Sequence, residues 1–198
     1  MAHPFEQIRP ELRVRLAWSF GAAGLLLGAL INWLGSRLQA PDGRPGGMAL
    51  QLAGAPSVVA WIVSAWTVPQ RALQQNLLIL DYGFLILYGV FLSLACLWAS
   101  ALWPKGVARQ VGVLVAWAQW AAAAFDAIEN AALLTILRPT LDPAAPVAPD
   151  ALIVTLGWVS TMLKWTLIEA GLIYIALSAL FDVIVNSWAR TVRASLDR

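Results

Sequence analysis

Two residue types that build many catalytic and metal sites are almost absent from this chain. Its 198 residues include one cysteine, Cys96, and one histidine, His3. A single cysteine excludes an internal disulfide and a CxxC-type metal site. A single histidine at the N-terminal tail argues against a haem, a catalytic histidine or a histidine-ligated zinc ion within the core. We therefore expect no metal ion and no cofactor.

Charged residues are also scarce. They make up 12% of the chain, whereas 60% is hydrophobic and the mean hydropathy is +0.72. Soluble domains carry about 25% charged residues, so this chain has too little polar surface to cover a soluble globule. The net charge of +2 is small and its basic residues are scattered between apolar runs, so we expect no nucleic-acid partner. The composition predicts a protein that lies in a lipid bilayer.

Four apolar runs are long enough to cross a bilayer, which takes about 20 helical residues. They predict membrane spans over about residues 16–36, 77–102, 110–137 and 154–188. The first run follows several arginines, as a signal peptide does, but it is longer than a usual signal-peptide core and lacks a good cleavage site. We therefore predict an uncleaved, all-α bundle of four membrane helices that forms a single domain over residues 1–198.

The basic residues that flank the spans predict the orientation, because Lys and Arg concentrate on the cytoplasmic side. With both termini inside, the inner segments hold Arg9, Arg13, Arg15, Lys105, Arg109, Arg190, Arg193 and Arg198, and the outer segments hold Arg37, Arg44, Arg71 and Arg138. Tryptophans fall near both predicted boundaries, as in an aromatic belt. We predict a multi-pass protein of a bacterial-type inner membrane with both termini in the cytoplasm.

The two outer loops, residues 38–76 and 138–150, differ in kind. The second, RPTLDPAAPVAPD, is rich in proline and cannot form a regular helix. The first contains an apolar stretch, residues 57–68, that is too short to cross the membrane. We expect a short helix there that lies in the interface or re-enters the outer leaflet. The alternative is a helix that caps the bundle from outside.

Small residues predict where helices approach closely. Gly24 and Gly28 form a GxxxG pair in the first span, and Ser93, Cys96 and Ser100 form a stripe in the second. Trp117 and Trp120 lie deeper than the aromatic belts, and packing is their favoured role over stacking on a ligand.

Each predicted span carries polar residues in its outer half: Asn32, Asp81, the group Asp126, Glu129 and Asn130, and the pair Lys164 and Glu169. A charged side chain at a helix centre costs about 2.5–3.5 kcal/mol on insertion scales, so such residues face the bundle interior. Residues three and four apart share a helix face, which places Asp126, Glu129 and Asn130 together. We predict an acidic site centred on Asp126 and Glu129, with Asn130, Asp81 and Glu169 as further contributors and Lys164 as counter-ion.

This site favours binding or transport of a proton, a cation or a small cationic amphiphile near the outer face. Four spans are few for a transporter, so we expect a homo-oligomer in that case. The alternative is a polar network that sets helix register in an accessory subunit of a larger membrane complex. An integral membrane enzyme acting on a lipid is less favoured, because no phosphate-binding glycine loop and no HExxH-type motif accompanies the carboxyls.

Overall fold

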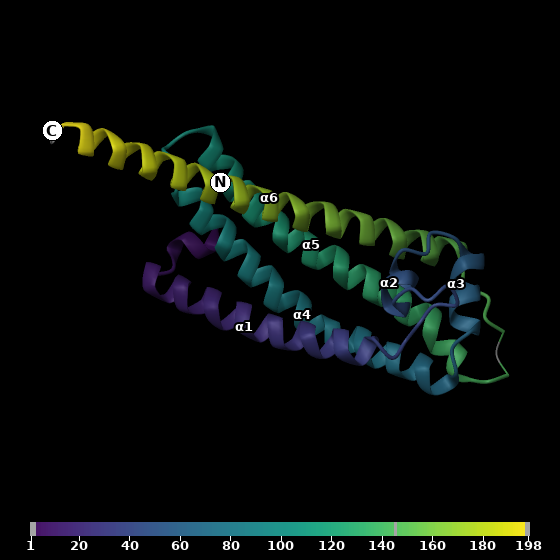
Figure 1. The fold of residues 1–198 in the computed structure, drawn as a ribbon. Helices are drawn as coiled ribbons and strands as arrows, with labels where there is room; N and C mark the ends of the chain where they lie inside the picture. The colour runs from purple at the N-terminus through teal and green to yellow at the C-terminus, as the bar shows by residue number, and fades with distance from the viewer. Residues whose placement is uncertain (1–2, 145, 197–198) are drawn as a thin grey trace.

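The computed structural model describes residues 3–144 and 146–196, and for residue 186 and residues 188–196 it describes the backbone alone. In chain order the elements are η1 (Pro4–Gln7), α1 (Pro10–Gly35), α2 (Gly46–Gln51), α3 (Pro56–Ser64), α4 (Val68–Ala101), α5 (Val107–Leu137), η2 (Arg138–Leu141) and α6 (Ala151–Leu196) (Figure 1). Over these residues the fold is all-helical. The helices α1, α4, α5 and α6 are each long and apolar enough to cross a membrane, which confirms four candidate spans.

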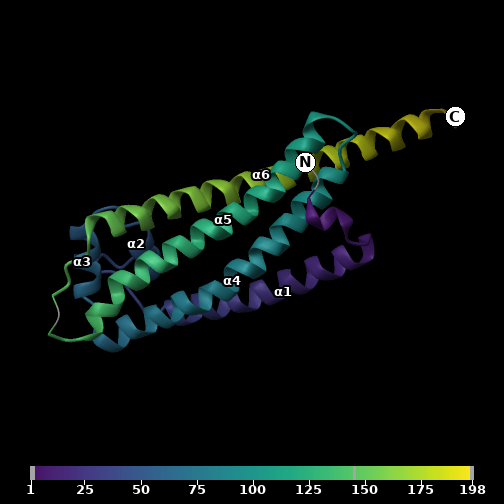
Figure 2. The ribbon, with the colours of Figure 1, turned by 180° about the vertical axis from the view of Figure 1, so that it is seen from behind.

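The long helices lie side by side with unequal contacts. Helix α5 packs against both α4 and α6, and α1 packs along α4 (Figures 1 and 2). The core of the bundle is therefore the α4–α5–α6 interface. We call the end that carries α2, α3 and η2 the cap end, and the opposite end the termini end. At the termini end, α6 extends beyond the other helices (Figures 1 and 2).

Helix α4 begins at Val68 rather than at residue 77, where the predicted span began. Thr67 and Gln70 form a capping box, and the Thr67 backbone N–H donates to Gln70 Oε1 at 2.9 Å. This exchange satisfies backbone groups that the first helical turn would otherwise leave unpaired. Hydropathy locates the apolar part of a helix, whereas the cap decides where the helix begins.

The cap end contains two short helices rather than the one predicted over residues 57–68. Helix α2 was not predicted, and α3 ends at Ser64. Val59, Ile62 and Val63 of α3 are buried in one apolar cluster with residues from the ends of α4 and α5. Trp66 follows α3 and donates from Nε1 to the Gln39 carbonyl at 2.8 Å, which ties the cap to the chain that leaves α1. Helix α3 therefore covers the end of the bundle.

The N-terminal tail, which carries His3, packs against α5. The His3 side chain is 1% exposed, and its ring packs against Trp117 of α5 and against Phe5. Phe5 in turn contacts Trp120, so both deep tryptophans pack against this segment. Burial lowers the pKa of His3, while Glu6 opposes that shift. Burial between Phe5 and Trp117 favours the neutral imidazole.

Helix α1 reaches α4 through its glycines, as the GxxxG pair predicted. A Cβ atom added at Gly28 would lie 2.9 Å from the Phe84 ring, and one at Gly24 would lie 3.5 Å from Leu87. The opposite face of α1 leaves large apolar side chains exposed, such as Leu25 and Leu26. Such a face suits contact with lipid.

These glycine contacts predict unequal effects of the same substitution. Gly28→Ala would push a methyl group into Phe84, whereas Gly24→Ala would make an ordinary contact and is the matched control. We expect Gly28→Ala to be less stable than Gly24→Ala by about 1–3 kcal/mol, the usual cost of overpacking. Unfolding by SDS titration in mixed micelles measures this difference, and equal stabilities would contradict the proposed contact.

Candidate acidic site in the bundle core

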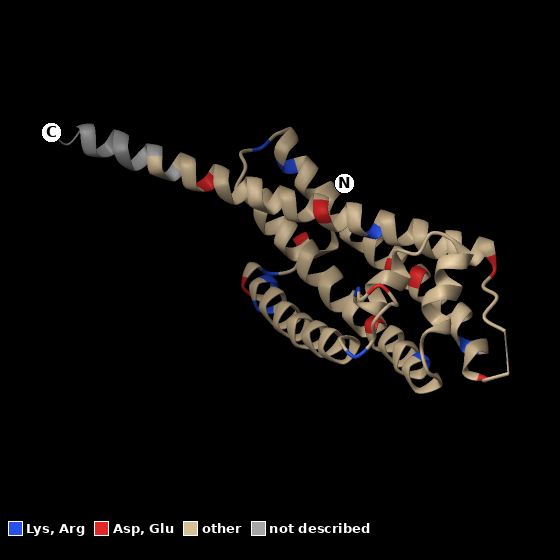
Figure 3. Cartoon of the chain, turned by 45° about the vertical axis from the view of Figure 1, so that its right-hand side comes forward, with Lys and Arg blue, Asp and Glu red and all other residues tan. Residues whose placement is uncertain are grey.

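Helix α5 places three polar side chains in the core of the bundle. Asp126, Glu129 and Asn130 are 3%, 0% and 0% exposed, so the shared face predicted from their spacing points into the protein. The neighbouring alanines Ala122 and Ala123 are also buried. Their small side chains let α4 and α6 approach the α5 backbone closely. Figure 3 shows charged residues of the chain among the long helices as well as at the ends of the bundle.

Helix α6 supplies the positive charge. Lys164 is 5% exposed, and its Nζ lies 2.8 Å from Asp126 Oδ1 and 2.7 Å from Glu129 Oε2. The contact with Asp126 is also a hydrogen bond, whereas the contact with Glu129 is an ion pair without hydrogen-bond alignment. A buried ammonium between two carboxylates is held by short-range attraction that water does not screen.

Helix α4 completes the site with Asp81 and Tyr88. Asn130 Nδ2 donates to Asp81 Oδ2 at 2.7 Å, and the Tyr88 hydroxyl donates to Asp126 Oδ2 at 3.0 Å. Asp81 also lies beside Asp126. Sequence reasoning did not assign Tyr88 to the site. Its spacing of seven residues from Asp81 could have done so, because residues two turns apart share a helix face.

The structure brings together five of the six predicted residues: Asp81, Asp126, Glu129, Asn130 and Lys164. Glu169 is the exception, because it is exposed on α6 and makes no hydrogen bond or ion pair with the other five. It follows Lys164 by five residues, which turns it about 140° around the helix axis. Asn32 is likewise exposed, on α1. The predicted depth of Glu169 was therefore not enough to place it in the site.

The charges of the site do not balance when every group is ionised. Asp81, Asp126 and Glu129 contribute three carboxylates, and Lys164 is the one cation that the structure places among them. Three acceptors are buried without a hydrogen-bond partner in the described part of the chain: Glu129 Oε1, Glu129 Oε2 and Asn130 Oδ1, of which Glu129 Oε2 is ion-paired with Lys164. Buried charge and buried acceptors without partners are both costly, so the arrangement favours uptake of positive charge.

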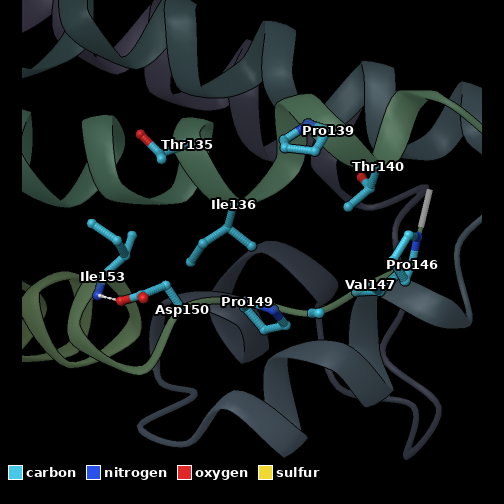
Figure 4. Close-up of a pocket in the computed structure, with 10 residues that line it drawn as sticks. Thr135, Ile136, Pro139, Thr140, Pro146, Val147, Pro149, Asp150 and Ile153 are labelled. Carbon is cyan, nitrogen blue, oxygen red and sulfur yellow. Dashed lines mark hydrogen bonds between the residues drawn. The ribbon is translucent and has the colours of Figure 1, made fainter.

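A separate pocket lies at the cap end. It has a volume of about 180 Å³ and lies between the end of α5 with η2 and the loop that leads into α6 (Figure 4). Its hydroxyls are already engaged, since Thr135 donates to the Ala131 carbonyl and Thr140 to the Leu137 carbonyl. Asp150 caps α6 by accepting from the Leu152 and Ile153 backbone N–H groups. None of the acidic-site residues lines this pocket.

Comparison of the chain with protein-family models, with curated proteins and with solved structures finds no match to any of them. The function therefore has to be argued from the geometry of the site.

The Lys164 contacts predict a strong dependence of stability on charge balance. Lys164→Met leaves Asp126 and Glu129 without their cation, and we expect a loss of about 3–5 kcal/mol, as for other broken buried ion pairs. The triple variant Lys164→Met, Asp126→Asn, Glu129→Gln should recover most of that loss, because the two carboxylates that paired with Lys164 are then neutral and Asp81 keeps its hydrogen bond from Asn130.

Lys105→Met is the control, because Lys105 is exposed in the turn between α4 and α5 and should tolerate the change. SDS titration in mixed micelles measures the free energy of unfolding of all three variants. A triple variant as unstable as Lys164→Met alone would show that the lysine acts through packing and not through charge.

Proposed function

We propose that this chain is a polytopic membrane protein that binds and releases a proton at its acidic site. The proposal is carried by one observation: the buried Asp126 and Glu129 share one lysine, beside the half-buried Asp81, in a core that leaves Glu129 Oε1 without a hydrogen-bond partner among the described residues. A carboxyl group in such surroundings gains from taking up a proton, because protonation removes a charge and supplies a hydrogen-bond donor. Intramembrane carboxyls of this kind commonly serve as proton-binding groups.

A proton fits the site better than the other ligands expected from the sequence. The central residues Asp126, Glu129 and Asn130 are at most 3% exposed, so an organic cation or an amphiphile would have to displace packed side chains to reach them. In the described residues no three His, Cys, Asp or Glu side chains are arranged to share a metal ion. The pocket at the cap end is also smaller than the 300 Å³ or more that ligand pockets usually have. A proton needs neither a cavity nor a coordination shell.

We also propose an inner-membrane location with both termini in the cytoplasm and with the α2–α3 cap at the outer face. The excess of basic residues in the sequence segments that flank the spans at the termini end supports this orientation, although Arg198, one of those residues, lies outside the described residues. Helix α3 would then lie at the level of the outer interface, where Trp61 is half exposed beside its buried apolar face. The acidic site would lie in the outer half of the bilayer.

Infrared difference spectroscopy during a pH titration tests proton binding. The purified protein should show a buried carboxyl band that appears as the pH falls, and Glu129→Gln should remove or shift it. Glu169→Gln is the matched control, because that glutamate is exposed and lies outside the site. A buried carboxyl band that does not change over the pH range in which the protein stays folded would support a static network that sets helix register.

Cysteine labelling tests the orientation. In a Cys96→Ala background, Asp142→Cys places a thiol in the exposed loop at the cap end, and Lys105→Cys places one in the exposed turn at the termini end. In intact cells we expect a membrane-impermeant maleimide to label residue 142, and to label residue 105 after lysis alone. The reverse pattern would overturn the proposed orientation while leaving the proton-binding proposal intact.

A further inference from the structure

Helix α6 exposes a carboxyl group in the middle of a candidate membrane span. Glu169 lies close to the centre of the span Ala151–Val185, and its side chain is exposed on the surface of the bundle. From this depth a glutamate is too short to reach the water on either side of the bilayer, unlike a lysine or an arginine near a helix end. Intramembrane carboxyls usually face the interior of a bundle or pair with other polar groups. Glu169 does neither, since it makes no hydrogen bond or ion pair with the described residues.

Glu169 belongs to a regular row of side chains on the exposed side of α6. Positions that alternate three and four residues apart share one helix face, and two helices interlock their side chains along such a row. On α6 this row, which we call the α6 seam, consists of Val159, Met162, Thr166, Glu169, Ile173, Ala176 and Leu180. Met162 is half-buried and the other six are exposed. At 1.5 Å per residue the seam is about 32 Å long, close to the hydrocarbon thickness of about 30 Å.

The residues around Glu169 allow a second helix to come close. Thr166 and Ala170 are four residues apart, they flank Glu169, and both are exposed. Small residues at this spacing let the backbones of two membrane helices approach each other. The Thr166 hydroxyl already donates to the Met162 carbonyl at 2.8 Å. Glu169 is therefore the polar group of the seam that lacks a partner among the described residues.

Helix α1 provides a contrast. The helices α1 and α6 lie on opposite sides of the bundle, with α4 and α5 between them (Figures 1 and 2). The middle of the exposed face of α1 carries Leu25, Leu26 and Leu30, and its exposed Asn32 lies within one turn of the helix end. Lipid can cover such a face. It would leave the carboxyl group on the face of α6 without a partner.

The molecule that covers Glu169 has to bring a polar group to the same depth. The described basic side chains of this chain lie near helix ends or in loops, except Lys164, which is buried in the acidic site. A contact between unlike faces of two copies would therefore bring no cation to Glu169. A second copy in the same orientation, however, has its own Glu169 at the same depth. Two carboxyl groups that meet in a low dielectric are not both ionised, and one then donates a hydrogen bond to the other.

We propose that the α6 seam is an interface between two copies of this chain, which pack their α6 helices in parallel about a two-fold axis and bring their Glu169 side chains into contact. Each copy contributes the same surface, so the contact closes at two copies. The interface goes beyond the proposed proton binding and does not depend on it. Glu169 is turned about 140° around the helix axis from Lys164, so the acidic site stays inside each copy.

Cysteine cross-linking in the membranes of the producing cells tests the interface in a Cys96→Ala background. Ile173→Cys places a thiol on the seam. Leu172→Cys is the matched control, because Leu172 is also exposed and lies at nearly the same depth, but is turned by about 100°. Copper phenanthroline, an oxidant, should join Ile173→Cys into a disulfide-linked dimer and leave Leu172→Cys monomeric.

Four results of this experiment would overturn the inference. Equal cross-linking of both variants would indicate random collision, and cross-linking of Leu172→Cys alone would indicate a different face. Monomers of both variants would show that lipid covers the seam. A product of Ile173→Cys with the mass of another protein would show that a different partner covers it.

The dissociation constant of the dimer in detergent micelles tests the role of Glu169, with energy transfer between labelled copies as the measurement. Glu169→Ala should raise this constant about tenfold, the size of a polar contact between membrane helices. Glu169→Gln keeps the hydrogen bonding and should restore the wild-type constant, and Leu172→Ala, which lies off the seam, should not change it. An unchanged or lower constant in Glu169→Ala would contradict the carboxyl contact. A monomeric protein that still shows the Glu129-dependent carboxyl band would overturn the dimer and leave the proton-binding proposal intact.

Discussion

The contact of Lys164 with Asp126 and Glu129 is the interaction on which the rest of the core depends. An ammonium and two carboxylates buried together lose their hydration, and only short distances between them can offset that loss. The distances of 2.8 and 2.7 Å require α6 to lie close to α5 at this depth. The buried alanines Ala122 and Ala123 next to Asp126 make such an approach possible. The ion pairs of Lys164 therefore require the close packing of α5 and α6 that the alanines allow.

The same contacts also lie between two apolar clusters along the length of the bundle. An apolar cluster that includes α3 lies at the cap end, the acidic site follows, and a smaller cluster that includes Leu92 and Ala123 lies on the termini side of it. A shift of α6 by one helical turn would move Lys164 away from both carboxylates and bring apolar side chains against them. Carboxylates that face apolar side chains in a low-dielectric core are costly. The depth of Lys164, Asp126 and Glu129 in the bundle therefore specifies the register of the three helices. The proton binding that we propose would take place at the same level, so a role in register and a role in function are compatible.

The parts of the fold that depend on local sequence were predictable. Hydropathy located four spans, and the spacing of Asp126, Glu129 and Asn130 placed them on one face that is indeed buried. Helix α4 begins more than two turns before the span predicted from residue 77, and the sequence from Thr67 to Gln70 carries a recognisable capping box. Tyr88 was not assigned to the site, although it follows Asp81 by two helical turns. Both the capping box and this spacing are local features of the sequence.

Other features could not be predicted from the local sequence. Glu169 has the right depth but the wrong angle around α6, and His3 belongs to a short segment that folds back against Trp117. By itself the sequence determined that the chain forms apolar helices and that α5 carries an acidic face, because periodicity and hydropathy are properties of neighbouring residues. Only the tertiary structure decided that Lys164 pairs with that face and that Asp81 joins it through Asn130. Those partnerships depend on how each helix is rotated against its neighbours, and that rotation follows from packing across the whole bundle.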